Sequence, residues 1–474
     1  MTEELPKGWR WVKLDDALDY VIGGDWGKDE NFEDSNYGLA YCIRGSEIKN
    51  WEEEKGRTAS LRKIKHSNIQ KRKLVEGDVL VEISGGGPEQ PVGRTVLIDK
   101  AVLSYKPEIP KICTNFLRLI RPKDFIEGKF LNLYLKHFYY SGEIVKYQGG
   151  SNNLRNLKFP DYVKINIPLP PKPTQLAIVS KIEELFSEIE NGIKSLFTAK
   201  EQLKKYRQSV LKWAFEGKLT NGLNGDLYDL YDEHDLSIAA EPETEYRVER
   251  NHNNQKNQKN HSSDKGELPE GWKWVKLGDV CDKIQDGSHF SPQVQYDEPG
   301  ENRFKYITAK NIRNDYMDFR KLTYVDKDFH DSIYNRCNPE FGDVLLTKDG
   351  INTGEVTLNT LHEPFSLLSS VCIFKTKRKD LKSEYLKYFI QSPLGSKAIL
   401  QSMTGTAIKR IVLKKIKESK ITLPTIEEQD KIVQAIESRL SVADKMEESI
   451  TQSLQQAEAL KQSILKKSFD GKLV

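Results

Sequence analysis

The chain carries one sequence pattern twice, and this duplication constrains its fold more than any other feature. Three repeated pieces occur in the same order in each half, which excludes coincidence. The pieces are L-P-K-G-W-R-W-V-K-L at 5–14 and L-P-E-G-W-K-W-V-K-L at 268–277, G-D-V-L at 77–80 and 342–345, and S-V-L-K-W-A-F-E-G-K-L at 209–219 and S-I-L-K-K-S-F-D-G-K-L at 463–473. The 474 residues therefore form a tandem repeat with small insertions and deletions.

Each half begins with a part that predicts a globular domain. Short apolar runs such as 77–83 and 92–98, bounded by glycine and proline, are typical of short strands between turns. A long helical pattern follows in both halves. The predicted class is α+β, with two tandem mixed α/β domains and two long helices. Antiparallel pairing of these helices as a coiled coil would bury both of their apolar stripes, and two tandem copies within one chain would make a pseudo-twofold arrangement.

The two long helices are predicted from apolar stripes whose spacings are mostly three and four residues. Each covers roughly 43 residues, or about 65 Å, too long to be buried in one small domain. Thr425 and Glu428 form a capping-box start, and both helices end at a glycine in F-[ED]-G-K-L. The stripes are Ile178, Ile182, Leu185, Ile189, Ile193, Leu196, Leu203, Tyr206, Val210 and Trp213, then Ile432, Ile436, Leu440, Ala443, Ile450, Leu454, Ala457, Leu460, Ile464 and Phe469.

The aromatic residues Phe197, Tyr206 and Trp213 of the first helix have two interpretations. They could dock partner subunits on an outer face, or they could complete the seam between the helices. For Tyr206 and Trp213 the sequence favours neither interpretation.

The predicted boundaries follow from these patterns. A stretch rich in Asn and Gln, with few apolar residues, separates the halves and is expected to be a linker. The predicted segments are a first globular domain at 1–168, a long helix at 169–220, the linker at 221–264, a second globular domain at 265–422 and a second long helix at 423–474.

Composition excludes several classes of protein. Lys and Arg number 73 against 70 Asp and Glu, so the net charge of +3 says little about partners. There is no apolar run of the length that a membrane span requires, and the first residues do not resemble a signal peptide. The five cysteines are dispersed without a C-x-x-C, and Cys113 and Cys372 are expected in the core. We expect a soluble, reduced, cytoplasmic protein.

Catalytic motifs are scarce. The glycine-rich residues 85–94 lack the ending of a phosphate-binding loop, and N-P-E-F at 338–341 predicts a turn rather than a methyltransferase motif. Asp34, Glu47 and Lys49 have the D…E-x-K order of a magnesium nuclease. In a chain with 30% charged residues, a solvated loop is the more frequent source of that pattern.

The segment before each long helix indicates nucleic-acid binding. Residues 395–420 hold seven Lys or Arg and one Glu, a local charge of +6, and 148–158 read Q-G-G-S-N-N-L-R-N-L-K. Glycine allows close approach to a phosphodiester chain, Arg suits guanine edges and Asn suits adenine edges. Composition alone is equally compatible with a solvated basic turn.

Other polar segments differ between the halves while the framework repeats. The second half has D-G-S-H-F, T-A-K-N-I and T-K-D-G at 286–290, 308–312 and 347–350. The matching segments of the first half are G-G-D-W-G, I-R-G-S and I-S-G-G-G-P-E-Q at 23–27, 43–46 and 83–90. Two domains that share one scaffold but recognise different targets would differ in this way.

Taken together, five features of the chain resemble the specificity (S) subunit of type I restriction-modification systems. They are the duplicated L-P-x-G-W start, the G-D-V-L strand, the glycine-hinged basic segment, the L-P…Q helix entrance and the long helices. D-G-S-H and T-A-K-N-I add to the resemblance, which covers nearly everything except the linker. The first half lacks the D-G-x-H and T-A-K-N signatures and has D-W-G and S-G-G-G-P-E-Q instead, which argues against a palindromic target.

The resemblance implies two target recognition domains that read the halves of a bipartite, asymmetric DNA sequence, with the helices fixing the spacer. It implies two methyltransferase (M) subunits and restriction (R) subunits as partners. S-adenosylmethionine, ATP and Mg²⁺ are expected on those partners, with no cofactor, metal or catalysis on this chain. The predicted DNA contacts are Arg44, Ser84, Gln90, Arg94, Ser151, Asn152, Asn153 and Arg155 in the first half, and Ser288, His289, Lys310, Asn311, Lys348, Thr406, Lys409 and Arg410 in the second.

Two other classes stay open at this stage. A self-contained nuclease would use Asp34, Glu47 and Lys49, and a coiled-coil scaffold would bind protein rather than DNA. Binding that weakens steeply with salt separates a DNA reader from the scaffold, because phosphate contacts release counterions.

Overall fold

The computed structural model of the chain divides into two compact units. Unit 1 comprises Met1–Phe197 and Thr451–Val474, and unit 2 comprises Thr198–Ile450. Each unit therefore contains one globular domain and a segment of both long helices. The residues that the structure describes are 5–87, 90–150, 155–219, 268–400 and 411–473. We name the globular parts domain 1, within residues 5–169, and domain 2, within residues 268–423.

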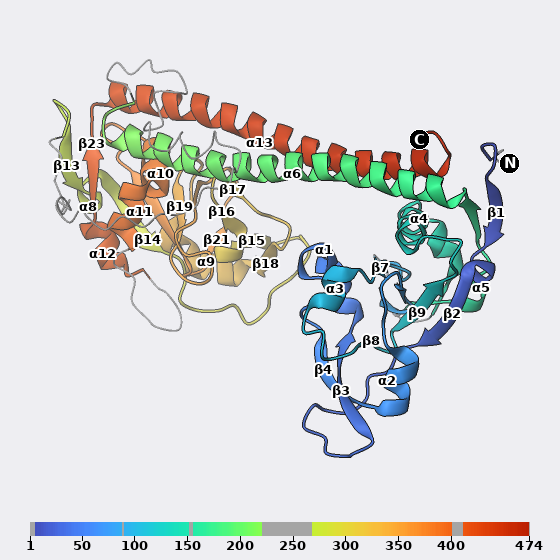
Figure 1. Ribbon diagram of the computed structural model, residues 1–474. Helices are drawn as coiled ribbons and strands as arrows, with labels where there is room; N and C mark the ends of the chain where they lie inside the picture. The colour runs from blue at the N-terminus through green and yellow to red at the C-terminus, as the bar shows by residue number, and fades with distance from the viewer. Residues whose placement is uncertain (1–4, 88–89, 151–154, 220–267, 401–410, 474) are drawn as a thin grey trace, which may run out of the picture. The chain divides into compact units, whose positions relative to one another are not determined.

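Domain 1 contains two main sheets (Figure 1). The antiparallel sheet has the order β2 (Leu18–Gly23), β9 (Leu117–Pro122), β5 (Val79–Glu82) and β7 (Thr95–Leu97). The other has the order β4 (Ser60–Lys65), β3 (Tyr37–Ile43) and β8 (Lys111–Cys113), with β8 parallel to β3. The remaining elements are a small sheet of β10 (Gln148–Gly149), β11 (Arg155–Leu157) and β6 (Ser84–Gly86), helices α1 (Trp51–Glu54), α2 (His66–Arg72), α3 (Lys100–Ser104), α4 (Gly128–Tyr140) and α5 (Phe159–Tyr162), and 3-10 helices η1 (Asp15–Ala17), η2 (Gly45–Asn50) and η3 (Glu143–Tyr147).

Domain 2 repeats both main sheets. The four-stranded sheet has the order β14 (Cys281–Asp286), β22 (Val371–Thr376), β19 (Val344–Thr347) and β20 (Val356–Leu358). The three-stranded sheet has the order β18 (Thr323–Asp326), β15 (Arg303–Ile307) and β21 (Ser366–Leu367), again with one parallel pair. The remaining elements are the hairpin β16 (Ile312–Arg313) and β17 (Tyr316–Met317), helices α8 (Leu277–Val280), α9 (Lys327–Cys337), α10 (Ser383–Gln391), α11 (Pro393–Leu400) and α12 (Leu413–Glu418), and 3-10 helix η4 (Ala309–Asn311).

The G-D-V-L motif leads into an inner strand of each four-stranded sheet, β5 in domain 1 and β19 in domain 2. Alternate side chains of a strand point to opposite faces, so these apolar strands contribute to two cores. In β5, Val79 and Val81 join one core and Leu80 joins the other. In β19, Val344 and Leu346 likewise face away from Leu345. The duplication in sequence is therefore a duplication in topology and packing.

The long helices are α6 (Lys172–Phe215) and α13 (Ile426–Phe469), each of 44 residues. Within unit 1, Ile182 near the start of α6 shares a core with Ile464 near the end of α13. Within unit 2, Val210 near the end of α6 shares a core with Ile436 near the start of α13. The helices therefore run antiparallel and side by side, which confirms the predicted coiled coil (Figure 1).

Aromatic residues of α6 take different places. Tyr206 is buried in the core of unit 2, Trp213 is partly buried and Phe197 is 56% exposed. Tyr206 therefore completes the seam, whereas Phe197 lies on the outer surface.

Both helices end in the same glycine cap. Gly217 and Gly471 adopt positive φ angles of 73° and 67°, which favour glycine. Lys218 N–H donates to the Trp213 carbonyl at 2.9 Å, and Lys472 N–H donates to the Lys467 carbonyl at 2.8 Å. These bonds are the 6→1 bonds of a Schellman motif, and they confirm the C-terminal glycine caps.

The L-P-x-G-W segments pack on these caps. A Cβ atom at Gly217 would collide with the ring of Pro269, and a Cβ atom at Gly471 would collide with the ring of Pro6. After each L-P-x-G-W segment, β1 (Arg10–Lys13) pairs with β12 (Asn166–Leu169), and β13 (Lys273–Lys276) pairs with β23 (Lys420–Leu423). In each unit, the start of one half therefore contacts the helix end of the other half.

A buried glutamine ties each domain to the start of its long helix. Gln175 donates from Nε2 to the carbonyls of Phe125 and Pro170, and its Oε1 accepts from Glu127 N–H at 2.8 Å. Gln429 makes the equivalent three bonds, to Asp380, Pro424 and Lys382. Both side chains are fully buried. The glutamine of the L-P…Q motif is thus a backbone clamp.

Replacing either clamp should destabilise its own unit. Gln175→Ala and Gln429→Ala each remove three hydrogen bonds to the backbone, one buried and two partly buried, so we expect each to lower the free energy of unfolding by about 2–4 kcal/mol. Urea denaturation measures the loss. The exposed Gln208→Ala, on α6, is the control and should change the value by less than about 0.5 kcal/mol. Equal effects of all three variants would contradict the assignment.

Candidate nucleic-acid interface

In domain 2, the carboxylate of Asp286 contacts side chains from helix α9 and from two loops. It ends β14 and is buried. Arg336 Nη2 lies 2.7 Å from Oδ1, while Lys348 Nζ and His289 Nε2 lie 3.1 and 3.2 Å from Oδ2. Burial raises the pKa of Asp286, but hydrogen bonds from Arg336 and Lys348 outweigh it and hold the pKa below its ordinary value. The D-G-S-H and T-K-D-G segments are therefore linked through one ion-pair network.

The glycine of D-G-S-H is required by close packing. A Cβ atom at Gly287 would collide with the backbone of Leu367, next to the bond from Ser288 N–H to the Leu367 carbonyl at 2.7 Å. Domain 1 repeats this approach, because a Cβ atom at Gly24 would collide with the backbone of Cys113. In both domains, a closely packed glycine therefore holds this loop against the three-stranded sheet.

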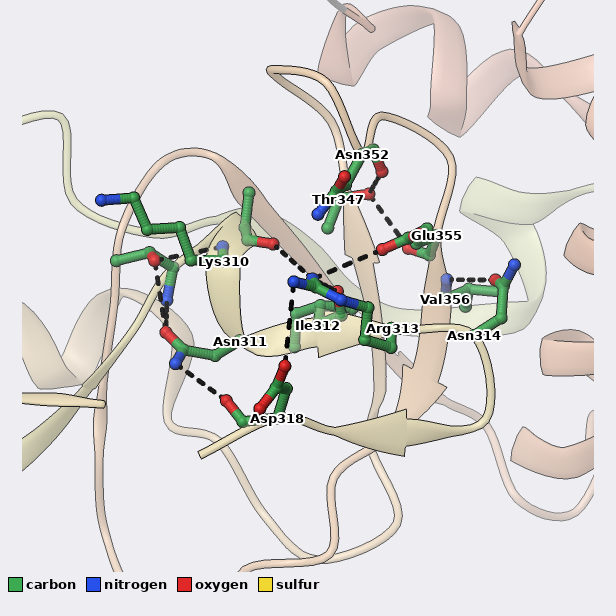
Figure 2. Close-up of polar contacts among 12 residues, drawn as sticks. Lys310, Asn311, Ile312, Arg313, Asn314, Asp318, Thr347, Asn352, Glu355 and Val356 are labelled. Carbon is green, nitrogen blue, oxygen red and sulfur yellow. Dashed lines mark hydrogen bonds and ion pairs between the residues drawn. The ribbon is translucent and has the colours of Figure 1, made fainter. Parts of the chain in front are cut away.

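The T-A-K-N segment forms 3-10 helix η4 at the end of β15. Asn311 is buried, its Oδ1 accepts from Thr308 N–H at 3.0 Å, and its Nδ2 donates to the Asp318 carbonyl at 3.0 Å (Figure 2). Lys310 is exposed beside it. The segment therefore uses Asn311 to hold the turn and presents Lys310 to solvent.

Arg313 braces the same region from the β16–β17 hairpin. Its guanidinium lies between Asp318, at 3.8 Å, and Glu355, at 3.6 Å (Figure 2). Hydrogen bonds from Arg320 hold the pKa of Asp318 well below its usual range, whereas burial raises the pKa of Glu355. Arg313 thus connects η4 to the turn after β19.

These loops surround a cavity of about 460 Å³ in domain 2. The T-A-K-N segment contributes Thr308 and Lys310, and the turn after T-K-D contributes Ile351 and Asn352. Tyr306 also lines the cavity. Segments that are far apart in sequence therefore form one polar hollow with an apolar edge.

Domain 1 builds the corresponding turn with different residues. Glu47 takes the place of Asn311 in 3-10 helix η2: it is buried, and its Oε2 accepts from Arg44 N–H at 2.5 Å. Its Oε1 accepts from Arg44 Nε at 2.9 Å. The same turn geometry thus presents Arg44 in domain 1, where domain 2 has Thr308.

Of two ion pairs in domain 1 that involve a buried carboxylate, one has a counterpart in domain 2 and the other does not. Buried Asp78 accepts from Arg121 Nε at 2.7 Å, and Asp343 in domain 2 accepts from Lys375 at 2.8 Å. Buried Glu82 accepts from Arg94 Nε at 2.8 Å, but Thr347 and Glu355 occupy the corresponding strand positions of domain 2. We infer that the repeated pair supports the scaffold and that the unrepeated pair belongs to the variable surface.

A cavity of about 780 Å³ gathers the predicted contacts of domain 1. Arg44, Ser84, Gln90 and Arg94 all line it, together with the partly exposed aromatic side chains of Trp26 and Phe116. Arg155 lies on β11, which pairs with β6, the strand of Ser84. The structure thus brings four of the predicted contacts to one cavity and places Arg155 on the strand that pairs with the strand of Ser84.

The predicted contacts of domain 2 divide into two groups. His289 and Lys310 are exposed. Ser288, Asn311 and Lys348 are buried and bond within the domain, so direct contact of their side chains with DNA does not fit the structure, and we reassign them to positioning the loops. The predicted contacts Ser151, Asn152, Asn153, Thr406, Lys409 and Arg410 lie outside the described residues.

Sequence reasoning missed the residues that organise these loops. Glu82 and Asp286 are the buried carboxylates that hold Arg94 and Lys348. A signal was available, since each ends an apolar or alternating strand where a charge is unexpected. The segment at 395–420 also differs from the predicted loop, because 393–400 and 413–418 are helical.

The residues of the alternative nuclease site have other partners. Both oxygens of Glu47 accept hydrogen bonds from Arg44, and Asp34 caps a turn by accepting from Asn36 N–H at 2.8 Å. Across the part of the chain that the structure describes, there is no group of three or more His, Cys, Asp or Glu able to hold a metal. Within those same residues, no helix is both long and apolar enough to span a bilayer.

The five cysteines are buried free thiols. Burial raises the pKa of Cys113 to about 12 and that of Cys372 well above its ordinary value. Both residues therefore serve as core side chains, as the sequence predicted.

Comparison with known proteins supports one family. A family model for the type I restriction modification DNA specificity domain matches residues 6–197 and 269–456. The chain is 23% identical over 477 residues to the EcoKI specificity subunit of Escherichia coli K12, covering 99% of this chain and 90% of that protein. It is 23% identical over 438 residues to the MjaVIII specificity subunit of Methanocaldococcus jannaschii, covering 92% and 86%.

Solved structures share the fold. A chain from a structural study of assembly and conformational transition of the type I R-M system has a TM-score of 0.65 at 18% identity, with 99% of both chains covered. The crystal structure of the HsdS subunit from Thermoanaerobacter tengcongensis has a TM-score of 0.53 at 19% identity, with both chains fully covered. Since the family model matches both halves of a chain with this fold, the protein belongs to the family of type I restriction-modification specificity subunits.

Proposed function

We propose that the chain reads a bipartite, asymmetric double-stranded DNA sequence, with one half-site for each domain. The observation that carries the proposal is the contrast between repeated scaffold and unrepeated cavity lining. The strand order, the glutamine clamps and the Asp78–Arg121 type of pair all recur. Arg44 and Arg94 of the first cavity have no arginine at the equivalent positions of the second.

The chemistry of both cavities suits base edges and phosphates. Arginine donors match the acceptors of guanine, and exposed lysine suits phosphate or base oxygens. The different linings would favour different half-sites, which fits an asymmetric target. The paired helices α6 and α13 would fix the spacer between half-sites, and a fixed spacing converts two weak contacts into one specific event.

The proposal includes a division of labour with partner subunits. Two methyltransferase subunits and restriction subunits would dock on the chain, and Phe197 is one exposed aromatic residue on α6 suited to such contact. S-adenosylmethionine, ATP and Mg²⁺ would act on those subunits, and the chain itself would supply recognition without catalysis.

Half-site specificity tests the proposal directly. In the complex with its methyltransferase partner, Arg44→Ala should relax the half-site of domain 1, and Lys310→Ala should relax that of domain 2. A lost base contact costs about 1–3 kcal/mol, so each change should reduce discrimination at one position at least about fivefold. Methylome sequencing of cells that express the complete system reads both half-sites at once.

Lys204→Ala removes an exposed lysine from α6 and is the control, with both half-sites retained. If Arg44→Ala relaxed both half-sites equally, Arg44 would be a phosphate contact instead. If the assembled complex showed no salt-dependent DNA binding, the scaffold alternative would replace the proposal.

A further inference from the structure

A large apolar side chain stands fully exposed at the cavity of domain 2. Ile351, in the turn between β19 and β20, has a relative exposure of 103%. Phe290, directly after D-G-S-H, is 78% exposed, and the next residue, Ser291, lines the same cavity as Ile351. An exposed apolar side chain at the edge of a polar cavity offers an apolar surface to a ligand that enters the cavity.

The turn that carries Ile351 is held by internal bonds. The hydroxyl of Thr347 contacts the carbonyls of Asn352 and Glu355, and Gly354 N–H donates to the Thr347 carbonyl at 2.9 Å. Gly350, with φ of +98°, allows the sharp bend before Ile351. An ordered turn loses little conformational entropy when its tip is covered, so Ile351 is prepared for contact.

The base of the turn is anchored to the rest of domain 2. Lys348 is buried against Asp286, with 3.1 Å between Nζ and Oδ2. Arg313 contacts Glu355 from the opposite hairpin, as Figure 2 shows. The position of Ile351 is therefore fixed relative to Lys310, which lines the same cavity.

The rest of the cavity lining near Ile351 is polar. Thr308, Lys310 and Asn352 line the same cavity, and Lys310 is exposed. A ligand for this site must therefore offer an apolar surface to Ile351 and polar atoms to Lys310 and the cavity.

A thymine edge in the major groove has this combination. Its C5-methyl group is apolar, and the adjacent O4 accepts a hydrogen bond. We propose that Ile351 contacts the C5-methyl group of a thymine in the half-site read by domain 2, next to Lys310, and thereby determines specificity at that position. The inference rests on the proposed function and adds the base and the chemical group that are read.

Deoxyuridine, which lacks only the methyl group, tests the contact. Methylome sequencing first gives the DNA sequence that the complex recognises. The half-site that becomes less specific in the Lys310→Ala variant is then the one read by domain 2. Synthetic duplexes then replace each thymine of both strands by deoxyuridine, and binding is measured for the full chain in complex with its methyltransferase partner. One position in that half should weaken wild-type binding about fourfold, the value for one buried methyl group.

Ile351→Ala should bind the thymine duplex about fourfold more weakly and show no further loss with deoxyuridine at that position. Phe341→Ala is the matched control, because Phe341 is 51% exposed but precedes β19, whereas Ile351 follows it. The control should keep the wild-type sensitivity to deoxyuridine.

Three results would overturn the inference while leaving DNA recognition intact. They are a domain 2 half-site without any A·T pair, full deoxyuridine sensitivity in Ile351→Ala, and an equal loss of affinity for all sequences in that variant, which would indicate a wedge or a backbone contact. A wild-type complex that does not bind its own methylated motif would instead contradict the proposed function itself.

Discussion

Asp286→Asn should lower the free energy of unfolding of unit 2 by about 3 kcal/mol, because the change breaks a buried ion pair and leaves one charge behind. Lys348 is buried, and its ammonium group lies 3.1 Å from Asp286 Oδ2. A neutral amide cannot compensate that charge, although Asp349 lies 3.5 Å away. Arg336 also loses its carboxylate partner. Urea unfolding followed by circular dichroism measures the loss.

The control is Asp331→Asn, which removes an exposed ion pair with Lys327 from α9. Both side chains are half exposed, so the change should cost less than about 1 kcal/mol. Combining Asp286→Asn with Lys348→Met should recover part of the stability, since the unpaired charge is gone. Similar losses for Asp286→Asn and Asp331→Asn would contradict the role given to Asp286.

The same pair predicts a dependence on pH. The pKa of Asp286 is lower in the folded chain than its ordinary value of 3.8, so the unfolded chain binds the proton more readily. The stabilisation that ionised Asp286 gives to the folded chain is therefore fully present above pH 3.8. It is lost as the pH falls through the lower pKa that Asp286 has in the folded chain. The difference between wild type and Asp286→Asn should shrink in that acidic range.

Phe215→Ala and Phe469→Ala should each destabilise the unit that contains the residue by about 4 kcal/mol, the cost of removing a buried aromatic side chain. Phe215 ends α6 and packs edge-on against Tyr385 and Phe389 of α10, with ring centroids 5.1 and 5.4 Å apart. Phe469 ends α13 and packs against Phe130 and Tyr134 of α4 at 5.4 and 5.2 Å. The repeat therefore predicts similar losses.

Phe197→Ala is the control, because Phe197 lies on α6 but is 56% exposed. It should change the free energy of unfolding by less than about 0.5 kcal/mol. Separate unfolding transitions, resolved by urea titration, should show Phe469→Ala acting on unit 1 and Phe215→Ala acting on unit 2. A loss confined to one of the two buried positions would argue against equivalent helix ends.

Local patterns predicted the framework well. The stripes, Thr425 and the two glycines Gly217 and Gly471 predicted helices of nearly the observed length, because helix periodicity and capping depend on residues within a few positions. G-D-V-L predicted the inner strands β5 and β19 for the same reason. The repeated pieces also predicted that both halves would share one fold.

The sites were predicted less completely. The group of Arg44, Ser84, Gln90 and Arg94 was recognised as polar loop residues, and the structure places all four at one cavity. Asn311 and Lys348 were expected to be accessible but are buried, because polar residues in a loop segment carry no local mark of burial. Their burial depends on partners elsewhere in the chain, Asp318 and Asp286.

By itself, the sequence determined the duplication, the α+β class and the two long helices. These follow from periodicity, turn chemistry and repetition, which act over short stretches of chain. Only the tertiary structure decided which segments form a unit, with Met1–Phe197 joined by Thr451–Val474. It alone decided that Asp286 gathers distant loops and that Ile351 stands exposed, because packing and ion pairing between residues far apart in sequence set burial.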